Sequence, residues 1–245
     1  GEFWSWGVVG GVMNWEDILA AFKKPLCGYP VAAARAAAYN PENYERMIVE
    51  LERLSTQADE MATNMFHLHA MNLLAEAREP RAFAPLMRIA ALPSEQLEAA
   101  LGDHLTESFK NCVAATCTDQ REHLIRAFVE NREHDEWARY ILVESLVLRV
   151  IAGDTPAGPL LEWLFSLGEK IRQWLQEQPV TVDTSNEELL MDALAGAISD
   201  LGTIEHIPLL QSWSDAGLLD PKIAGIGWYI KELKRPLAER RERFF

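Results

Sequence analysis

Apolar residues between positions 66 and 130 recur at the period of an α-helix. In the first helix of this stretch they form one stripe, at i, i+4, i+7, i+8 and i+11: Phe66, Ala70, Leu73, Leu74 and Ala77. Pro80 interrupts the stripe and suits the first turn of the helix that follows. The stretch therefore predicts two consecutive helical hairpins, and such hairpins bury their apolar faces only by stacking on neighbours.

Capping signals extend this pattern along the chain. Asn14 and Asn40 are good N-cap residues, Ser94 can cap a short helix, and Gly102 suits the end of that helix. Residues 56–60 lack the helical period and predict a loop. Helices are predicted, among others, at residues 15–24, 31–39, 41–56, 94–101, 135–152, 189–202, 203–213, 221–233 and 237–245. No segment alternates with period two, so the chain is predicted to be all-α.

Residues 135–152 stand out because they are apolar almost all the way round the predicted helix. A helix without a polar face belongs in the interior, so we expect this segment in the middle of the stack. Leu148 here and Leu73 in the first hairpin are predicted core residues. Glu144 lies on the same side as Leu148, and a carboxylate there requires an ion-pair partner, a proton or access to water.

The expected architecture is a right-handed α-α superhelix of stacked antiparallel helix pairs, similar to HEAT and armadillo repeats. Such an array has no internal boundary, so residues 13–245 are predicted to form a single domain. Residues 1–12 are glycine-rich, aromatic and without helical period, and Met13 directly precedes the cap Asn14. We therefore expect residues 1–12 to be a flexible or vector-derived extension before a native start at Met13.

Charge narrows the classes of partner. The 245 residues carry 23 Lys or Arg against 37 Asp or Glu, a formal net charge of −14, which disfavours binding to nucleic acid. Residues 231–243 are the local exception and predict a basic, solvated helix that pairs with the acidic body. No apolar run reaches the roughly 18 residues of a membrane span, and no signal peptide is evident, so the expected location is the cytoplasm without membrane association.

The three cysteines, Cys27, Cys112 and Cys117, make an odd number without a close-spaced pair. This usage argues against a disulfide framework and against a zinc knuckle. Cys112 and Cys117 are expected to be reduced, buried core residues. We expect neither a metal nor a cofactor.

Three segments carry a resemblance to a known family: HLHAMNLLAEAREPRAFAPLMRI, LGDHLTES with the following NCVAATC, and AGLLDPKIAG. Over about residues 16–227 the chain resembles the bacterial domain-of-unknown-function family eleven eighty-six, which consists of uncharacterised helical-repeat proteins. The resemblance implies a HEAT-like superhelix and supplies no reaction, substrate or catalytic residue. Some members carry a cysteine-rich, zinc-binding tail, to which nothing here corresponds because no cysteine follows Cys117.

Several polar residues are candidates for a ligand or partner surface. His67 and His69 point apart by roughly 200° on one helix, so they cannot share a metal. The candidate residues are His69, Asn72 and Glu76, which share a helix face, Asp103 and His104 in a turn at a helix start, and Glu144. Each also has a simpler interpretation: a solvated polar face for the first three, helix capping for Asp103 and a structural ion pair for Glu144.

No phosphate-binding loop, nucleophile elbow or HExxH motif is present in the sequence. The leading hypothesis is therefore a non-catalytic scaffold that binds another protein through its concave face. The alternative is a small-molecule-binding protein or enzyme with a site around His69, Glu76, Asp103, His104 and Glu144. These two hypotheses differ in one observable, because an enzyme needs several of these side chains around one pocket.

Overall fold

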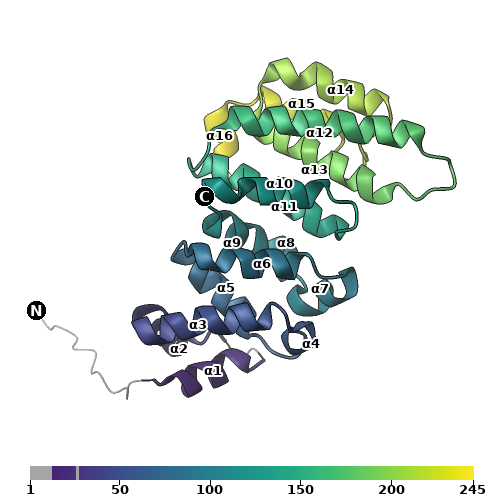
Figure 1. Ribbon diagram of the computed structural model, residues 1–245. Coiled ribbons are helices and arrows are strands. Elements are labelled where there is room, and N and C mark those ends of the chain that lie inside the picture. The colour runs from purple at the N-terminus through teal and green to yellow at the C-terminus, as the bar shows by residue number, and fades with distance from the viewer. Residues whose placement is uncertain (1–12, 26–27) are drawn as a thin grey trace, which may run out of the picture.

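The computed structural model describes residues 13–25 and 28–245, so the predictions for residues 1–12 and Cys27 lie outside the described residues. Within the described ranges the chain folds into sixteen α-helices and three short 3-10 helices, without a strand (Figure 1). The predicted all-α class is confirmed. None of the described helices combines the length and the apolar character that crossing a membrane requires.

The helices follow one another with short connections. In chain order they are α1 (Trp15–Lys23), α2 (Val31–Tyr39), α3 (Pro41–Leu54), α4 (Ala58–Met61), α5 (Phe66–Glu76), η1 (Pro80–Ala82), α6 (Phe83–Ala90), α7 (Ser94–Leu101), α8 (His104–Glu107), α9 (Phe109–Thr116), η2 (Asp119–Arg121), α10 (Glu122–Glu130), α11 (Glu136–Ile151), α12 (Ala157–Glu177), α13 (Ser185–Leu201), η3 (Ile204–His206), α14 (Ile207–Asp215), α15 (Gly225–Lys234) and α16 (Leu237–Glu242).

Side-chain caps fix three of the predicted helix starts. Asn14 Oδ1 accepts a hydrogen bond from the Asp17 amide at 2.9 Å, and Asn40 does the same for the first turn of α3. Asp135 Oδ1 accepts from the Ala138 amide at 2.9 Å at the start of α11. Each cap satisfies an amide that has no partner inside its helix.

Two local predictions were wrong. Residues 56–60 were expected to form a loop, but α4 occupies residues 58–61 within and beyond this stretch. Ser94 does not cap α7. Its hydroxyl instead donates to Asp135 Oδ2 at 2.6 Å, so it links α7 to the start of α11.

The helices form pairs whose second members pack on one another in order. The contacts run from α5 to α9, α11, α13 and α15, and we call these five helices the second-helix row. The first helices of the pairs are α3, α6, α10, α12 and α14, and they lie beside the row (Figure 1). Trp213 of α14 packs directly on Gly168 of α12, whereas α6 and α10 are further apart. A groove of about 540 Å³ between α6 and α10 is one result of this spacing.

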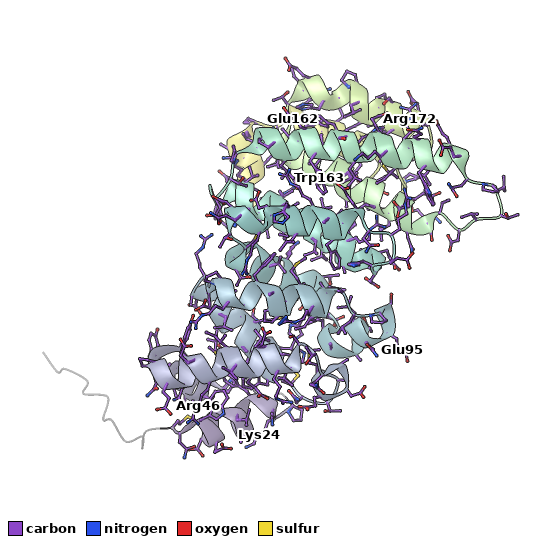
Figure 2. The ribbon with its side chains drawn as sticks, in the orientation of Figure 1. Lys24, Arg46, Glu95, Glu162, Trp163 and Arg172 are labelled. Atoms are coloured by element: carbon purple, nitrogen blue, oxygen red, sulfur yellow. The ribbon has the colours of Figure 1, made fainter. Side chains whose placement is uncertain are left out.

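Side chains bridge the first helices where the backbones do not pack closely. Trp163 of α12 lies over α10 (Figure 2), and its Nε1 donates to Glu130 Oε1 at 2.7 Å. The Arg126 guanidinium lies 5.7 Å from the Trp163 ring. The spacing of α10 and α12 is therefore set in part by polar and aromatic contacts.

The helix α11 lies in the middle of the row, between α9 and α13. Eleven of its sixteen residues are buried, which confirms that residues 135–152 are among the most buried of the chain. Two of the buried residues are arginines, Arg139 and Arg149, which are 1% and 2% exposed. Guanidinium groups at this depth require partners on every side.

Arg139 and Arg149 find those partners on neighbouring elements. Arg139 donates to the Val129 carbonyl at 2.7 Å and pairs with Glu187 at the start of α13. Arg149 donates to the Cys117 carbonyl and to Glu122 Oε1, both at 2.6 Å, at the junction of α9 and α10. The two arginines therefore join α11 to both of its neighbours.

The basic segment near residue 243 differs from its prediction. It forms the end of α15 and the whole of α16, in agreement with the helices predicted at residues 221–233 and 237–245, but it is not solvated throughout, because Arg240 is only 3% exposed. Arg240 donates to the carbonyls of Ser199 at 2.6 Å and Gly202 at 2.8 Å, at the end of α13. Arg243 forms an ion pair with Asp200, so the predicted pairing with the acidic body does occur.

The two described cysteines are buried, as predicted. Cys112 is 1% and Cys117 is 6% exposed, and both are free thiols. Burial raises the pKa of Cys112 to about 12 and that of Cys117 to about 11. Both side chains therefore serve as small, unreactive core residues at neutral pH.

Leu142 and Leu148, on the same helix, provide a matched test of the core. Leu142 is fully buried, whereas Leu148, predicted to be in the core, is only half-buried because it lines cavities. We expect Leu142→Ala to lower the free energy of unfolding by about 2–5 kcal/mol, and Leu148→Ala to lower it by less than about 2 kcal/mol. Urea titration followed by circular dichroism measures both, and equal losses would contradict this packing.

Candidate functional site

The second-helix row contains a cavity of about 510 Å³. Its walls come from α9, α11, α13, the start of α15 and the segment after α16. The lining residues are Lys110, Tyr140, Glu144, Val147, Leu148, Ala193, Gly196, Ala197, Asp200, Ile223, Ala224, Trp228, Tyr229, Arg243 and Phe244. Most of this lining is apolar or aromatic, with four charged side chains among it.

Small residues on α13 create the space. Ala193, Gly196 and Ala197 lie at i, i+3 and i+4, so they share one face of the helix. This spacing is typical of close helix packing, but here the face borders the cavity, and a Cβ atom added at Gly196 would meet nothing within 4 Å. The small side chains thus leave room for a ligand rather than for another helix.

Glu144 of α11 forms an ion pair with Lys110 of α9 inside this cavity. The two side chains are 32% and 27% exposed, so the pair borders water. The structural ion pair predicted for Glu144 is therefore confirmed. A half-exposed pair of this kind adds little to stability but fixes the positions of two opposite charges.

A fully buried carboxyl group lies behind the aromatic wall. Asp192 of α13 accepts a hydrogen bond from the Tyr229 hydroxyl at 3.1 Å and another from the Asp220 amide at 3.2 Å. Burial raises the pKa of Asp192 to about 6, although these hydrogen bonds oppose the shift. Burial, together with the charges of Glu144 and Asp192, raises the pKa of Tyr140 to about 12, so the Tyr140 hydroxyl at the cavity is neutral at pH 7.

The candidate residues of α5 lie elsewhere. His69 was expected on a solvated polar face, but it is 8% exposed, with the Phe22 and Tyr29 rings at 5.1 Å and 5.9 Å. Burial lowers its pKa, so the imidazole is neutral at pH 7. Asn72 and Glu76 are exposed, and the Asn72 amide donates to a backbone carbonyl of its own helix.

Asp103 and His104 line a separate cavity of about 400 Å³ near α5 and α7. Asp103 occupies the N-cap position of α8, but its side chain makes no capping hydrogen bond, contrary to the simpler interpretation of this residue. The electrostatic interaction with His104 contributes to the lowered pKa of His69, after the larger effect of burial. The five residues of the alternative site thus do not border one cavity, since Glu144 lies at the larger one.

The sequence analysis did not identify most of the charged and aromatic residues at the larger cavity. Asp192 had a usable signal, because it interrupts the apolar run LLMDALAGAIS in the same way that Glu144 interrupts its own helix. No sequence signal marked Trp228, Asp200 and Arg243, because they line the cavity only through the way in which α13 and α15 pack. In residues 13–25 and 28–245, no group of three His, Cys, Asp or Glu side chains is arranged to hold a metal ion.

Comparison with known proteins identifies the family. The model of the family described as "Protein of unknown function (DUF1186)" matches residues 13–167, more than half of the chain. The chain belongs to this family. The match covers the first two segments on which the resemblance was based, while AGLLDPKIAG lies beyond it.

Two relatives are uncharacterised proteins of Chlamydia. The protein from Chlamydia muridarum is 28% identical over 155 residues, which are 63% of this chain and 57% of the relative. The protein from Chlamydia trachomatis serovar D is 27% identical over 155 residues, 63% of this chain and 56% of the relative. The chain thus spans little more than half the length of these relatives. No solved structure matches it.

The buried Asp192 gives a pH-dependent prediction. Its folded pKa of about 6 exceeds the unfolded value of about 3.9, so its contribution to stability is complete below about pH 4 and is lost as pH rises through 6. Asp192→Asn lacks this ionisation and keeps an acceptor for Tyr229. We therefore expect the Tm of the variant minus that of the wild type to rise between about pH 4 and pH 7.

Asp183→Asn is the control for this measurement. Hydrogen bonds from Ser185 lower the pKa of the exposed Asp183, so its contribution is present above the unfolded pKa and is lost as pH falls. The Tm difference for Asp183→Asn should therefore have the opposite slope or none. Parallel melting curves of wild type and Asp192→Asn across the range would show that Asp192 does not ionise with a raised pKa.

Proposed function

We propose that this protein is a non-catalytic helical-repeat scaffold that binds a segment of another protein in the cavity of the second-helix row. One observation carries the proposal: α9, α11, α13 and α15, from successive helix pairs, all contribute walls to one cavity. Its volume of about 510 Å³ lies in the range of roughly 300–1,000 Å³ that is usual for binding pockets.

The spacing of the helices supports a concave position for the cavity. In a curved array the helices on the inner side approach each other, and those on the outer side are spread apart. The second helices touch in sequence, while the first helices α3, α6, α10 and α12 have fewer backbone contacts with one another. We therefore propose that the second-helix row is the inner face of a right-handed superhelix.

The chemistry of the cavity suits recognition of a peptide. Ile223 and Trp228 border it and are 44% and 39% exposed, so they offer apolar area to a partner. Its charged side chains are already paired, Lys110 with Glu144 and Arg243 with Asp200. Paired charges fix register and orientation, whereas a catalytic group needs a free acid, base or nucleophile.

A small-molecule ligand in the same cavity is the second candidate. The buried Asp192, hydrogen-bonded to Tyr229 in the cavity wall, favours it, because carboxyl groups with raised pKa values cluster at ligand sites. A metabolite that raises the Tm of the wild type but not of Tyr229→Phe would support this candidate over a protein partner.

The charge of the whole chain guides the choice of partner. With a net charge of −14, the protein should prefer a basic or neutral protein segment to DNA or RNA. Cys112 and Cys117 are free, buried thiols, which suits the cytoplasm. We therefore propose a cytoplasmic protein partner.

Binding can be tested with a partner captured from the source cells, identified by mass spectrometry, purified and titrated by calorimetry. Ile223→Arg places a charge in the apolar mouth of the cavity and should weaken binding at least about tenfold. Trp228→Ala removes an aromatic contact and should weaken it by a similar factor. Both residues are partly exposed, so both variants should remain folded.

Two control variants make comparable substitutions at exposed residues outside the cavity. Val49→Arg on α3 and Trp137→Ala at the start of α11 alter residues that are 68% and 45% exposed and do not line the cavity. Their affinities should match that of the wild type. Equal binding by Ile223→Arg and Val49→Arg would contradict the proposal. Wild-type binding should also weaken with salt, because exposed charges more than about 10 Å apart are screened at about 0.1 M.

A further inference from the structure

Residues 243–245 of the chain already lie against the second-helix row. Arg243 and Phe244 line the large cavity, and Phe244 and Phe245 line a neighbouring cavity of about 230 Å³. Phe244 and Leu148 of α11 each border both cavities, so they lie where the two cavities meet. The segment therefore occupies part of the surface that we propose for a partner.

The guanidinium of Arg243 sits in a site made by two helices. It pairs with Asp200 of α13, and its Nη1 lies 3.4 Å from Glu232 Oε2 of α15. Its Cζ atom lies 5.5 Å from the centre of the Trp228 ring, also on α15. Two carboxylates and an aromatic face are the groups that bind a guanidinium well, because they combine ion pairing with cation–π attraction.

The charges around this site favour a cation. Glu144 also acts on Arg243, since its charge opposes the fall in the pKa of Arg243 that burial causes. Lys110 pairs with Glu144, and Arg235 pairs with Glu232 at 3.0 Å, so Asp200 is the carboxylate whose ion pair is with Arg243 alone. Without Arg243, this part of the cavity would hold an uncompensated negative charge next to an indole ring.

Residues 243–245 are attached less firmly than the helix before them. The buried Arg240 fixes α16 through the carbonyls of Ser199 and Gly202. After α16, Phe244 is half-buried and Phe245 is 91% exposed. The segment can therefore leave the cavity by rotation after α16, without loss of the Arg240 hydrogen bonds.

We propose that the cavity recognises a protein segment in which an arginine is followed by an aromatic residue, and that residues 243–245 occupy the same place as an internal competitor. This inference rests on the proposed function and names the chemistry of the partner. The incoming arginine binds Asp200 and stacks on Trp228, and the aromatic residue takes the position of Phe244 over Leu148. Binding then requires that the chain's own segment moves aside.

A fluorescent peptide with the sequence of residues 238–245, AERRERFF, is the probe. The double variant Arg243→Ala/Phe244→Ala vacates the site, whereas in the wild type the tethered segment competes at an effective concentration on the order of millimolar. We expect the peptide to bind the double variant at least about tenfold more tightly than the wild type, measured by fluorescence anisotropy. Circular dichroism checks that the variant is folded, and Phe244→Ala alone replaces it if it is not.

Three controls test the chemistry. Adding Asp200→Asn to the double variant should weaken peptide binding at least about tenfold, because the ion-pair partner is lost. The peptide with Glu in place of Arg243 should not bind. Val49→Arg, on α3 and away from both cavities, should leave the affinity of the wild type for the peptide unchanged. Equal peptide affinity for the wild type and the double variant, or equal binding of both peptides, would overturn the inference.

The captured partner separates this inference from the proposed function. One outcome is that Ile223→Arg abolishes partner binding while Arg243→Ala/Phe244→Ala leaves it unchanged. The partner then binds in the cavity, but residues 243–245 do not compete with it. If Ile223→Arg leaves partner binding unchanged, the proposed function is wrong, whatever the peptide does. Tighter partner binding by the double variant supports both the proposed function and the competition by residues 243–245.

Discussion

The stack depends on how α11 is enclosed. This helix has helical neighbours on both sides in the second-helix row, and two arginines within it are almost fully buried. A guanidinium in the interior is tolerated only when its donors are satisfied, so Arg139 and Arg149 dictate where carbonyls and carboxylates of other elements must lie. Arg149 fixes the junction of α9 and α10, and Arg139 fixes the start of α13. The position of each neighbouring helix is therefore determined by polar contacts as well as by apolar packing.

The cavity follows from the same arrangement. Tyr140 and Glu144 lie one turn apart on α11, and Leu148 follows one turn later, so this side of the helix forms a continuous wall. The facing residues of α13 are too small to reach it, as the open space at Gly196 illustrates. A helix pair that brought larger side chains to this face would have closed the gap. The cavity is thus a consequence of side-chain size on one helix, within a row that is otherwise closely packed.

The sequence allowed the elements to be predicted better than the site. Helix starts at Asn14, Asn40 and Asp135 depend on hydrogen bonds over two or three residues, so local reasoning was sufficient. His69 shows the limit, because a polar residue opposite an apolar stripe can still be covered by aromatic rings from another segment.

The larger cavity shows the same limit. The side chains of Lys110 and Glu144 meet across 34 positions of sequence, and those of Asp200 and Arg243 across 43. Helical periodicity identifies the face on which a side chain lies but not the helix that this face meets. The ion pair of Glu144 could be predicted, because a carboxylate on the apolar side of a helix requires a partner, a proton or water, but the identity of the partner could not.

The open groove between α6 and α10 has a mechanical consequence. Neighbouring helix pairs that are packed along one side and separated along the other can bend about the packed side. Such bending widens or narrows spaces like the groove between α6 and α10, while distances along the second-helix row change little. The cavity lies on that row, so bending of this kind would leave the spacing of its walls largely unchanged.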